Sequence, residues 1–441
     1  MVNHIFGLRM LRLNLQLTMI VLITALVSLS MFVFMPDSFK DKPCGDCEGG
    51  YIIVAKNLID GKGLVDRNGV ISTTRPPGNT LVVAGLLYVQ RWLEVPQQKV
   101  FWMFNSLMIA FSAILILMIS RLIWEKQDAV CVPYVWITYP FVLWFINQPY
   151  PEISYFVASF STVYMYLLSY RHTSRGYWAY GLTIGLLSAV GMMIKPVGMG
   201  IPVIVIVVIM ILHRERSWQE RIKFSIAIVC GVLVLVMPWS AFVYTNSGKV
   251  IFLTDNIVLR NSLINGVTFA TRGEEYREKL TLHPRVVRFM ETIELELKST
   301  EDKILQEETV TDSQLQNQNE VGRVLDVIIK VSLEDPLGAL YLLGTKIVRS
   351  WYGTDSHKLE NYAIGIQLVY ISMISLSFVG IIKKSLVHKE ILFIVLALIL
   401  YYWAMSVLFE PLVRYLIPAL GVLLILLPGL WASRSRVAVT G

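Results

Sequence analysis

Two acidic residues in the loop after the first hydrophobic run have the chemistry of a general base. Asp46 and Glu48 stand a few residues before Tyr51, with two glycines between. A carboxylate just outside a membrane can take the proton of a hydroxyl or amine acceptor. The glycines allow close backbone approach, which both a tightly folded site and a flexible loop use. The alternative is that these loop acids are solvated and have no catalytic role.

A basic Pro-Pro corner ends the same loop. Arg75 precedes Pro76 and Pro77. The fixed φ angles of proline and its restriction of the preceding residue keep the backbone at Arg75 extended. A guanidinium held in this way suits bidentate bonds to a phosphate, and a contact with lipid headgroups is the alternative.

Three further ionisable residues stand at the ends of hydrophobic runs. Glu152 begins one run, either as a functional group or as a favourable anion at a helix N-terminus. Lys195 ends another run, where function and snorkelling to headgroups both explain a cation. Arg414 opens the last run, where a cation opposes the helix dipole, so we expect it to pair with Glu410 or to bind an anion.

A basic and aromatic cluster precedes the eighth run. Arg349 stands there with Lys346, Trp351 and Tyr352. Such a cluster fits an anion site, and it fits equally the aromatic belt found at membrane interfaces.

These candidate residues belong to a chain whose composition indicates a polytopic membrane protein. Of its 441 residues, 55% are hydrophobic and only 16% are charged, against about 25% charged in soluble proteins. A bilayer core about 30 Å thick needs about 20 apolar residues per helix. The sequence offers about ten such runs, near residues 14–35, 101–123, 130–146, 152–170, 178–194, 197–212, 224–243, 361–382, 390–409 and 413–432.

The distribution of basic residues predicts the orientation of these spans. The first run follows Arg9 and Arg12 and continues without a small-residue cleavage site, so we interpret it as a retained anchor. The turns near 147–151, 195 and 410 are nearly free of Lys and Arg, which places them outside. Both termini are therefore expected in the cytoplasm and the candidate site on the extracytoplasmic side. The net charge of +7 follows from this topology, and no nucleic-acid partner is expected.

The expected fold is an all-α polytopic bundle of about 10–11 transmembrane helices, with interfacial helices and an extracytoplasmic cap. Residues 321–351 predict two interfacial helices, broken at Asp335-Pro336. The predicted division is residues 1–35 for the cytoplasmic N-terminus and first span, 36–100 for the active-site loop with interfacial helices, 101–243 for spans two to seven, 244–360 for the second extracytoplasmic region, and 361–441 for the last three spans and the cytoplasmic C-terminus.

The cysteines predict no metal site. Cys131 and Cys230 fall inside hydrophobic runs, whereas Cys44 and Cys47 lie outside, where a disulfide can persist. A single C-x-x-C without a nearby His supplies at most half a metal site. No cofactor is predicted with certainty, and a divalent cation is left open.

Several short motifs follow one another along the chain. They are an outward acid before Tyr51-x3-Ala55-x2-Leu58-x2-Gly61, then Arg75-Pro76-Pro77-Gly78, Pro151-Glu152, Gly185-Leu186 with Lys195-Pro196, Pro238-Trp239, Asn246 with Gly248, and Arg414-Tyr415 with Pro418. Their order resembles the GT-C superfamily, especially the branch of the protein O-mannosyltransferases and the lipid A aminoarabinose transferases. The resemblance runs from about residue 14 to about residue 430.

This resemblance implies an enzyme that passes a sugar, with inversion, from a polyprenyl-phosphate carrier to an acceptor outside the membrane. The acceptor is a glycan, lipid or protein, and the absence of any Asn-x-Ser/Thr site fits a prokaryotic plasma membrane. The loop acid is then the base. Glu48 is the better match, but Cys47 stands where the family commonly has the Asp of an Asp-Glu pair, which leaves Asp46 open.

The resemblance also suggests roles for the other residues. Arg75 holds the donor phosphate and Arg414 assists, while Glu152 positions the acceptor or sugar. Together the predicted site residues are Glu48, Asp46 and Glu152 as catalytic groups, Arg75, Arg414, Lys195 and Arg349 as donor phosphate-binding groups, and Tyr51, Tyr150 and Tyr415 as substrate-positioning groups.

Two other functions share these features. A lipid-linked oligosaccharide flippase or other transporter is also polytopic and lipid-binding, but it is expected to keep ionisable residues near the bilayer midplane on broken helices. Here they cluster at the outward edge, which favours surface chemistry. A polymerase or ligase using a diphosphate-linked glycan has the same outward site, and the sequence does not separate it from a single-sugar transferase.

Overall fold

The chain is helical in nearly all the residues that the computed structural model describes. These are residues 2–34, 48–124, 128–171, 176–269, 280, 282–307, 320–354, 359–384 and 386–431. Among them the extended pairing amounts to one antiparallel bridge between Val65 and Ile71. The predicted all-α class is therefore confirmed.

The chain divides into two compact units. The first comprises Met1–Leu253, Met373–Leu398 and Leu420–Gly441, and the second comprises Thr254–Ser372 and Ile399–Ala419. Three C-terminal helices contribute residues to both units, namely α19 (Glu360–Lys384), α20 (Lys389–Leu408) and α21 (Val413–Leu424). The predicted division by loops and spans remains a prediction.

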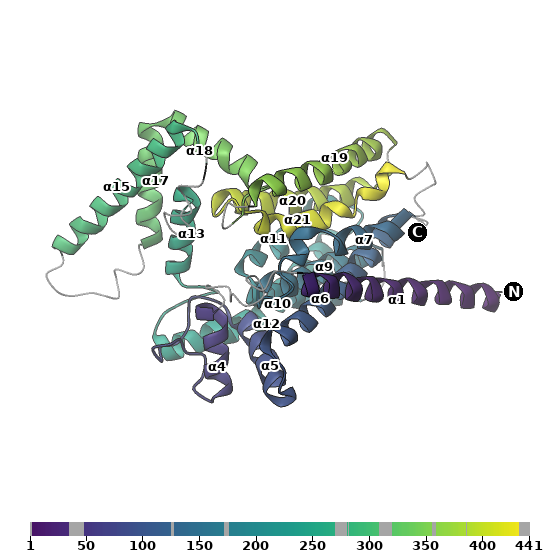
Figure 1. Cartoon of the computed structure of the whole chain (residues 1–441). Helices are drawn as coiled ribbons and strands as arrows, with labels where there is room; N and C mark the ends of the chain where they lie inside the picture. Colours follow the sequence, from purple (N-terminus) through teal and green to yellow (C-terminus); the bar gives the residue numbers. More distant parts are fainter. Residues whose placement is uncertain are drawn as a thin grey trace. The chain divides into compact units, whose positions relative to one another are not determined.

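The first unit contains most of the long helices (Figure 1). In chain order its N-terminal part has α1 (Val2–Phe34), the π-helical turn η1 (Glu48–Ile52), α4 (Ile53–Ile59), α5 (Pro77–Leu93), α6 (Gln97–Ile123), the 3-10 turn η2 (Asp128–Cys131), α7 (Val132–Ile137), α8 (Pro140–Leu143), α9 (Pro151–Arg171), α10 (Tyr177–Ile194), the 3-10 turn η3 (Pro196–Met199), α11 (Gly200–Leu212) and α12 (Trp218–Ser247). A last 3-10 turn, η4 (Leu427–Leu430), follows α21.

The packing of α10 on α12 shows how the sequence builds this unit. Ser217 and Glu220 form a capping box that starts α12. Gly185 of α10 and Gly231 of α12 stand where the two backbones approach closely. A Cβ on Gly185 would lie 2.1 Å from the carbonyl oxygen of Ile228, so only glycine fits. Small residues at the contact are the usual way for membrane helices to pack closely.

Six described helices are long and apolar enough to cross a membrane, and each coincides with a predicted span. They are Asn14–Phe34, Gln97–Ile123, Tyr177–Ile194, Trp218–Ser247, Glu360–Lys383 and Lys389–Leu408. The predicted span at 130–146 is instead two short helices, α7 and α8, because Pro140 starts a new helix. The runs at 197–212 and 413–432 give helices shorter than a full span. The total of 10–11 spans remains a prediction.

The second unit contains a small helical cluster before α19 (Figure 1). Its helices are α13 (Asn256–Thr268), α15 (Pro284–Glu307), α17 (Glu320–Glu334) and α18 (Pro336–Arg349). The predicted break at Asp335-Pro336 is confirmed, since Asp335 caps the N-terminus of α18 by accepting a bond from the amide of Gly338. Buried residues of all four segments share one apolar core, which includes Val267, Phe289, Val327 and Leu342.

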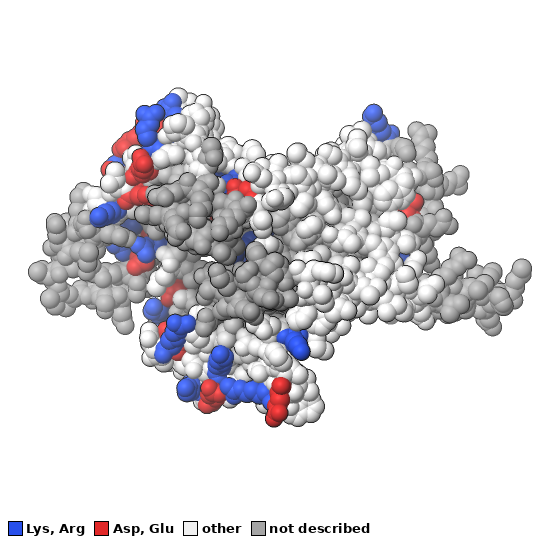
Figure 2. Space-filling model, viewed as in Figure 1, with Lys and Arg blue, Asp and Glu red and all other residues white. Residues whose placement is uncertain are grey.

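Charged side chains are unevenly distributed on the described surface. In the view of Figure 2 they gather over α4 and α5 in the first unit and over α15 and α17 in the second. The surface of the long helices in this view is almost free of charge. This is the distribution expected where spans face lipid and the segments between them face water.

Candidate active site

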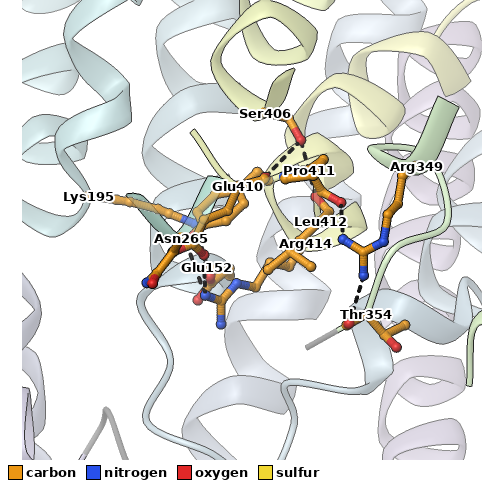
Figure 3. A network of polar contacts seen from close by, with 11 residues as sticks. Glu152, Lys195, Asn265, Arg349, Thr354, Ser406, Glu410, Pro411, Leu412 and Arg414 are labelled. Atoms are coloured by element: carbon orange, nitrogen blue, oxygen red, sulfur yellow. Dashed lines mark hydrogen bonds and ion pairs between the residues drawn. The ribbon is translucent and has the colours of Figure 1, made fainter. Parts of the chain in front are cut away.

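A buried ion pair joins the start of α9 to the end of α10 in the first unit (Figure 3). The Nζ of Lys195 lies 2.9 Å from Oε1 of Glu152, and the two side chains are 11% and 4% exposed. Glu152 stands in the first turn of α9, and Lys195 leaves the helical conformation at the end of α10. The structure thus brings together two residues predicted for the site and 43 positions apart in the sequence.

Two buried asparagines fix the loop that leads to Glu152. The Nδ2 of Asn105 on α6 lies within 3.1 Å of three carbonyl oxygens, those of Phe145, Ile146 and Gln148. The Nδ2 of Asn79 on α5 donates to the carbonyl of Pro149 at 3.2 Å. Because backbone carbonyls must be paired in an apolar interior, these bonds hold the loop that precedes α9.

The basic Pro-Pro corner packs against the end of α10. A Cβ on Gly78 would lie 2.5 Å from the carbonyl oxygen of Met193, two residues before Lys195. This close approach holds the corner that carries Arg75. The guanidinium of Arg75 lies over the ring of Tyr51, 4.5 Å from the centroid, in a cation–π contact.

Two of the predicted tyrosines share one apolar cluster. Tyr51 is buried among Ile52 of η1, Val83 of α5 and other residues of α4, α5 and α6, and Tyr150 packs against the same cluster. Tyr150 also makes an edge-to-face contact with Phe145 at 5.3 Å. In the first unit Tyr51, Arg75, Tyr150, Glu152 and Lys195 are therefore linked by direct packing or by adjacent positions.

The structure describes the backbone of Glu48, but not the side chain of either candidate base. Glu48 begins the π-helical turn η1, which runs directly into α4, and its side chain lies outside the described part of the structure. Asp46, Cys44 and Cys47 also lie outside the described residues. A single π-helical turn at this point is of interest because such turns occur often at functional sites.

The second unit contains an acid-centred cluster (Figure 3). The carboxylate of Glu410 accepts bonds from Arg414 at 3.4 Å, from the Tyr415 hydroxyl at 3.2 Å and from Asn265 at 3.3 Å. Arg414 also donates to the Tyr415 hydroxyl at 3.0 Å. The expected pairing of Arg414 with Glu410 is confirmed.

Arg349 is more deeply buried than an interfacial belt requires. Its side chain is 2% exposed and lies 2.5 Å from Glu360. It donates to the carbonyl of Pro411 at 3.3 Å and stacks over Phe269 at 5.1 Å. These contacts tie Arg349 to the backbone around Pro411, next to Glu410, and its contact with the donor phosphate remains a prediction.

Lys346 is a second buried cation of the same helix, and α18 lies outside the six candidate spans. Its Nζ donates to the carbonyl of Leu408 at 3.1 Å. Burial lowers the pKa of Lys346 from 10.5 to about 7, because desolvation disfavours the ammonium form, and the nearby Glu410 only partly offsets this effect.

The residues that hold the candidate groups in place were not predicted from the sequence. Asn79, Asn105 and Asn265 were not singled out, although each makes a side-chain bond at a candidate residue or at the loop beside it. One signal was available for Asn105, since an amide inside a predicted span is expected to have a structural partner.

The described residues include no group of three or more His, Cys, Asp or Glu side chains that could hold a metal ion. The side chains of Asp46 and Glu48 lie outside the described part of the structure, so the statement does not cover them.

Comparison with known proteins identifies the fold. Neither a protein-family model nor a curated protein sequence matches the chain. Solved structures of the oligosaccharyltransferase of the archaeon Archaeoglobus fulgidus do match. The complex of AglB with an inhibitory peptide and a dolichol-phosphate aligns with a TM-score of 0.55 and 12% identity, over 93% of this chain and 50% of that one. The complex with Zn and sulfate gives a TM-score of 0.52 and 12% identity, over 93% and 48%.

A third structure of that enzyme, tethered to an acceptor peptide, gives a TM-score of 0.53 and 11% identity over 93% of this chain and 49% of that one. This chain thus spans about half the length of the structures it matches. At this identity the likeness shows the fold alone, and membership of the GT-C superfamily remains a prediction. The particular branch remains a prediction.

Proposed function

We propose that this protein is an integral-membrane glycosyltransferase that moves a sugar from a polyprenyl-phosphate carrier to a glycan, lipid or protein acceptor. The proposal places the reaction at the extracytoplasmic face of a prokaryotic plasma membrane. The supporting fold is that of an oligosaccharyltransferase, and one structure of that enzyme contains a dolichol-phosphate, itself a polyprenol-type phosphate.

One observation carries the proposal. In the first unit, the guanidinium of Arg75 lies over an aromatic ring, and the proline corner that carries it packs against the end of α10 at Met193. Two residues later, Lys195 forms a buried carboxylate–ammonium pair with Glu152. A partly exposed Arg75 suits the donor phosphate because its fork forms charge-assisted bonds to phosphate oxygens. Lys195 adds a second positive group in the same unit.

The proposed step is an inverting displacement. Glu48 or Asp46 takes the proton of the acceptor hydroxyl or amine, and the freed electron pair forms the bond to the anomeric carbon. The bond between that carbon and the phosphate oxygen breaks from the opposite face, and the polyprenyl phosphate leaves with its electrons. Arg75 stabilises the charge that develops on the leaving phosphate, while Glu152 orients the acceptor or the sugar.

In the second unit, Arg414 contacts the donor phosphate in the proposed reaction. Glu410 and Tyr415 orient its guanidinium. Phosphate contact by Arg349 remains a prediction. Arg414→Lys keeps a positive charge beside Glu410, whose side chain is only 7% exposed, and is expected to lower transfer by removing the guanidinium fork without a large loss of stability.

The test is native mass spectrometry of the purified protein, of Glu48→Gln and of Asp46→Asn, combined with a transfer assay using the lipid that is found. A polyprenyl monophosphate bearing one sugar, enriched on the inactive variant, supports the proposal and identifies the donor. Diphosphate-linked oligosaccharide on all three proteins would favour the flippase or polymerase instead. Full turnover by both variants would reject the assignment of the base.

Arg75 is tested against a matched arginine of the same region. Arg75→Leu is expected to weaken donor binding, whereas Arg91→Leu removes a surface cation that pairs with Asp60 and is 50% exposed. Both variants lose one positive charge. Equal donor binding by both would refute phosphate recognition by Arg75.

A further inference from the structure

Helix α18 carries its charges on its buried side and its apolar residues on its exposed side. Its two charged residues, Lys346 and Arg349, are only 5% and 2% exposed. Leu337, Leu340 and Val348 are 52%, 61% and 60% exposed. No exposed position of this helix carries a charge.

This arrangement is the reverse of a helix at a protein–water surface. Such a helix places its apolar stripe on the core and its charges in solvent. A continuous exposed apolar face marks contact with a membrane or with another protein. The surroundings of α18 decide between these two.

The neighbouring helix α17 lies at a boundary between apolar and charged surface. Its exposed positions form two adjacent lines at a spacing of four residues, one apolar with Leu325, Ile329 and Leu333, and one charged with Asp326, Lys330 and Glu334. Lys330 bonds to Glu296 of α15 at 2.9 Å, so the charged line belongs to the polar side of this helical cluster. A helix with this pattern suits the plane between lipid and water.

The C-terminal end of α18 contacts a candidate span. Trp403 of α20 donates its ring N–H to the carbonyl of Ile347 at 3.2 Å and to the hydroxyl of Ser350 at 3.0 Å. Trp351 packs edge-to-face on Trp403 at 5.5 Å. Tryptophan is enriched where spans meet the membrane interface. Leu400 of α20, 59% exposed, extends the apolar surface along the span.

We propose that the exposed face of α18 contacts the lipid chains of the bilayer, with Lys346 and Arg349 turned away from the lipid. The helix has 14 residues and is about 21 Å long, too short to cross a core about 30 Å thick. It therefore lies along the membrane and covers the backbone of residues 408–411 within its own unit. This membrane contact does not depend on the proposed sugar transfer.

The test places nitroxide labels at single cysteines in the full chain, after the four native cysteines are replaced by serine. Leu340→Cys probes the exposed face of α18, Leu400→Cys serves as the control on a candidate span, and Lys330→Cys serves as the control on the charged line. The proteins are reconstituted in phosphatidylcholine vesicles, and collision rates with oxygen and with a water-soluble nickel chelate are measured by electron paramagnetic resonance.

The expected result is an oxygen-to-nickel collision ratio several-fold higher at positions 340 and 400 than at position 330. A ratio at 340 equal to that at 330 would show a water-facing helix and overturn the proposal. Spectral broadening between labels would show a second copy of the chain on this face, and low rates with both reagents would show another protein segment there; either would also overturn it. Val348→Cys provides the same test if Leu340→Cys does not fold.

Discussion

The pair of Glu152 and Lys195 gives the sharpest test of how the candidate site is held together. At 2.9 Å and with little exposure, the two charges form a buried ion pair. Removing one partner of a buried pair typically costs about 3 to 5 kcal/mol. Lys195→Met and Glu152→Gln are therefore each expected to destabilise the first unit strongly.

The double variant is expected to recover much of this loss. With both charges gone, neither side chain carries a desolvation cost that lacks compensation, so the coupling energy should reach about 2 to 3 kcal/mol, near the upper end for contacting residues. Equilibrium unfolding in mixed micelles measures all three free energies. If the two single effects simply add within about 0.5 kcal/mol, the pair does not behave as a buried unit and the reasoning fails.

A surface pair of equal length provides the control. Arg91 and Asp60 are also 2.9 Å apart, but their side chains are 50% and 40% exposed. The same cycle with Arg91→Met and Asp60→Asn should give a coupling energy of about 0 to 1 kcal/mol. Because distance is matched, the difference between the two cycles reports burial.

Three further predictions follow from local geometry. Gly50→Ala places a Cβ 2.7 Å from the Cζ of Arg75 and should reduce donor binding without a change in thermal stability. Gly49→Ala adds a Cβ in open space and should leave donor binding intact. Equal affinities of the two variants for the donor would contradict this prediction. Asn105→Leu removes the side-chain donor shared by three carbonyls and should lower the free energy of unfolding by about 1 to 3 kcal/mol. An unchanged free energy of unfolding would show that other contacts hold the loop. Burial lowers the pKa of His213 below its ordinary 6.5, so the unfolded chain binds the proton first and stability should fall as pH drops below about 6.5. His213→Gln should flatten that pH dependence in denaturant titrations, and an unaltered slope would assign it to another group.

The sequence predicted the features that depend on local pattern. The six long spans appear where apolar runs predicted them, and the break between α17 and α18 falls at the predicted Asp335-Pro336. The prediction of one span at 130–146 was wrong, because apolar composition does not indicate that one helix ends and another begins at Pro140.

The contacts that hold the site depend on distant segments. Asn105 meets carbonyls about 40 positions away, and no local pattern indicates such a partner. Glu152 and Lys195 were each identified, but the alternatives of helix capping and snorkelling stayed open because their pairing is a property of the folded unit.

The energetic cost of burying Glu152 and Lys195 also bears on their function. A buried ion pair often contributes less to stability than well-packed apolar residues of similar size, so stability alone does not account for Glu152 and Lys195 at the ends of α9 and α10. If the pair orients substrate, Glu152→Gln/Lys195→Met should be stable yet slow in sugar transfer. If the pair is only structural, the same variant should transfer at the rate of the unmodified protein. Stability and turnover measured on one double variant therefore separate the two roles, which neither single variant can do because each loses both together.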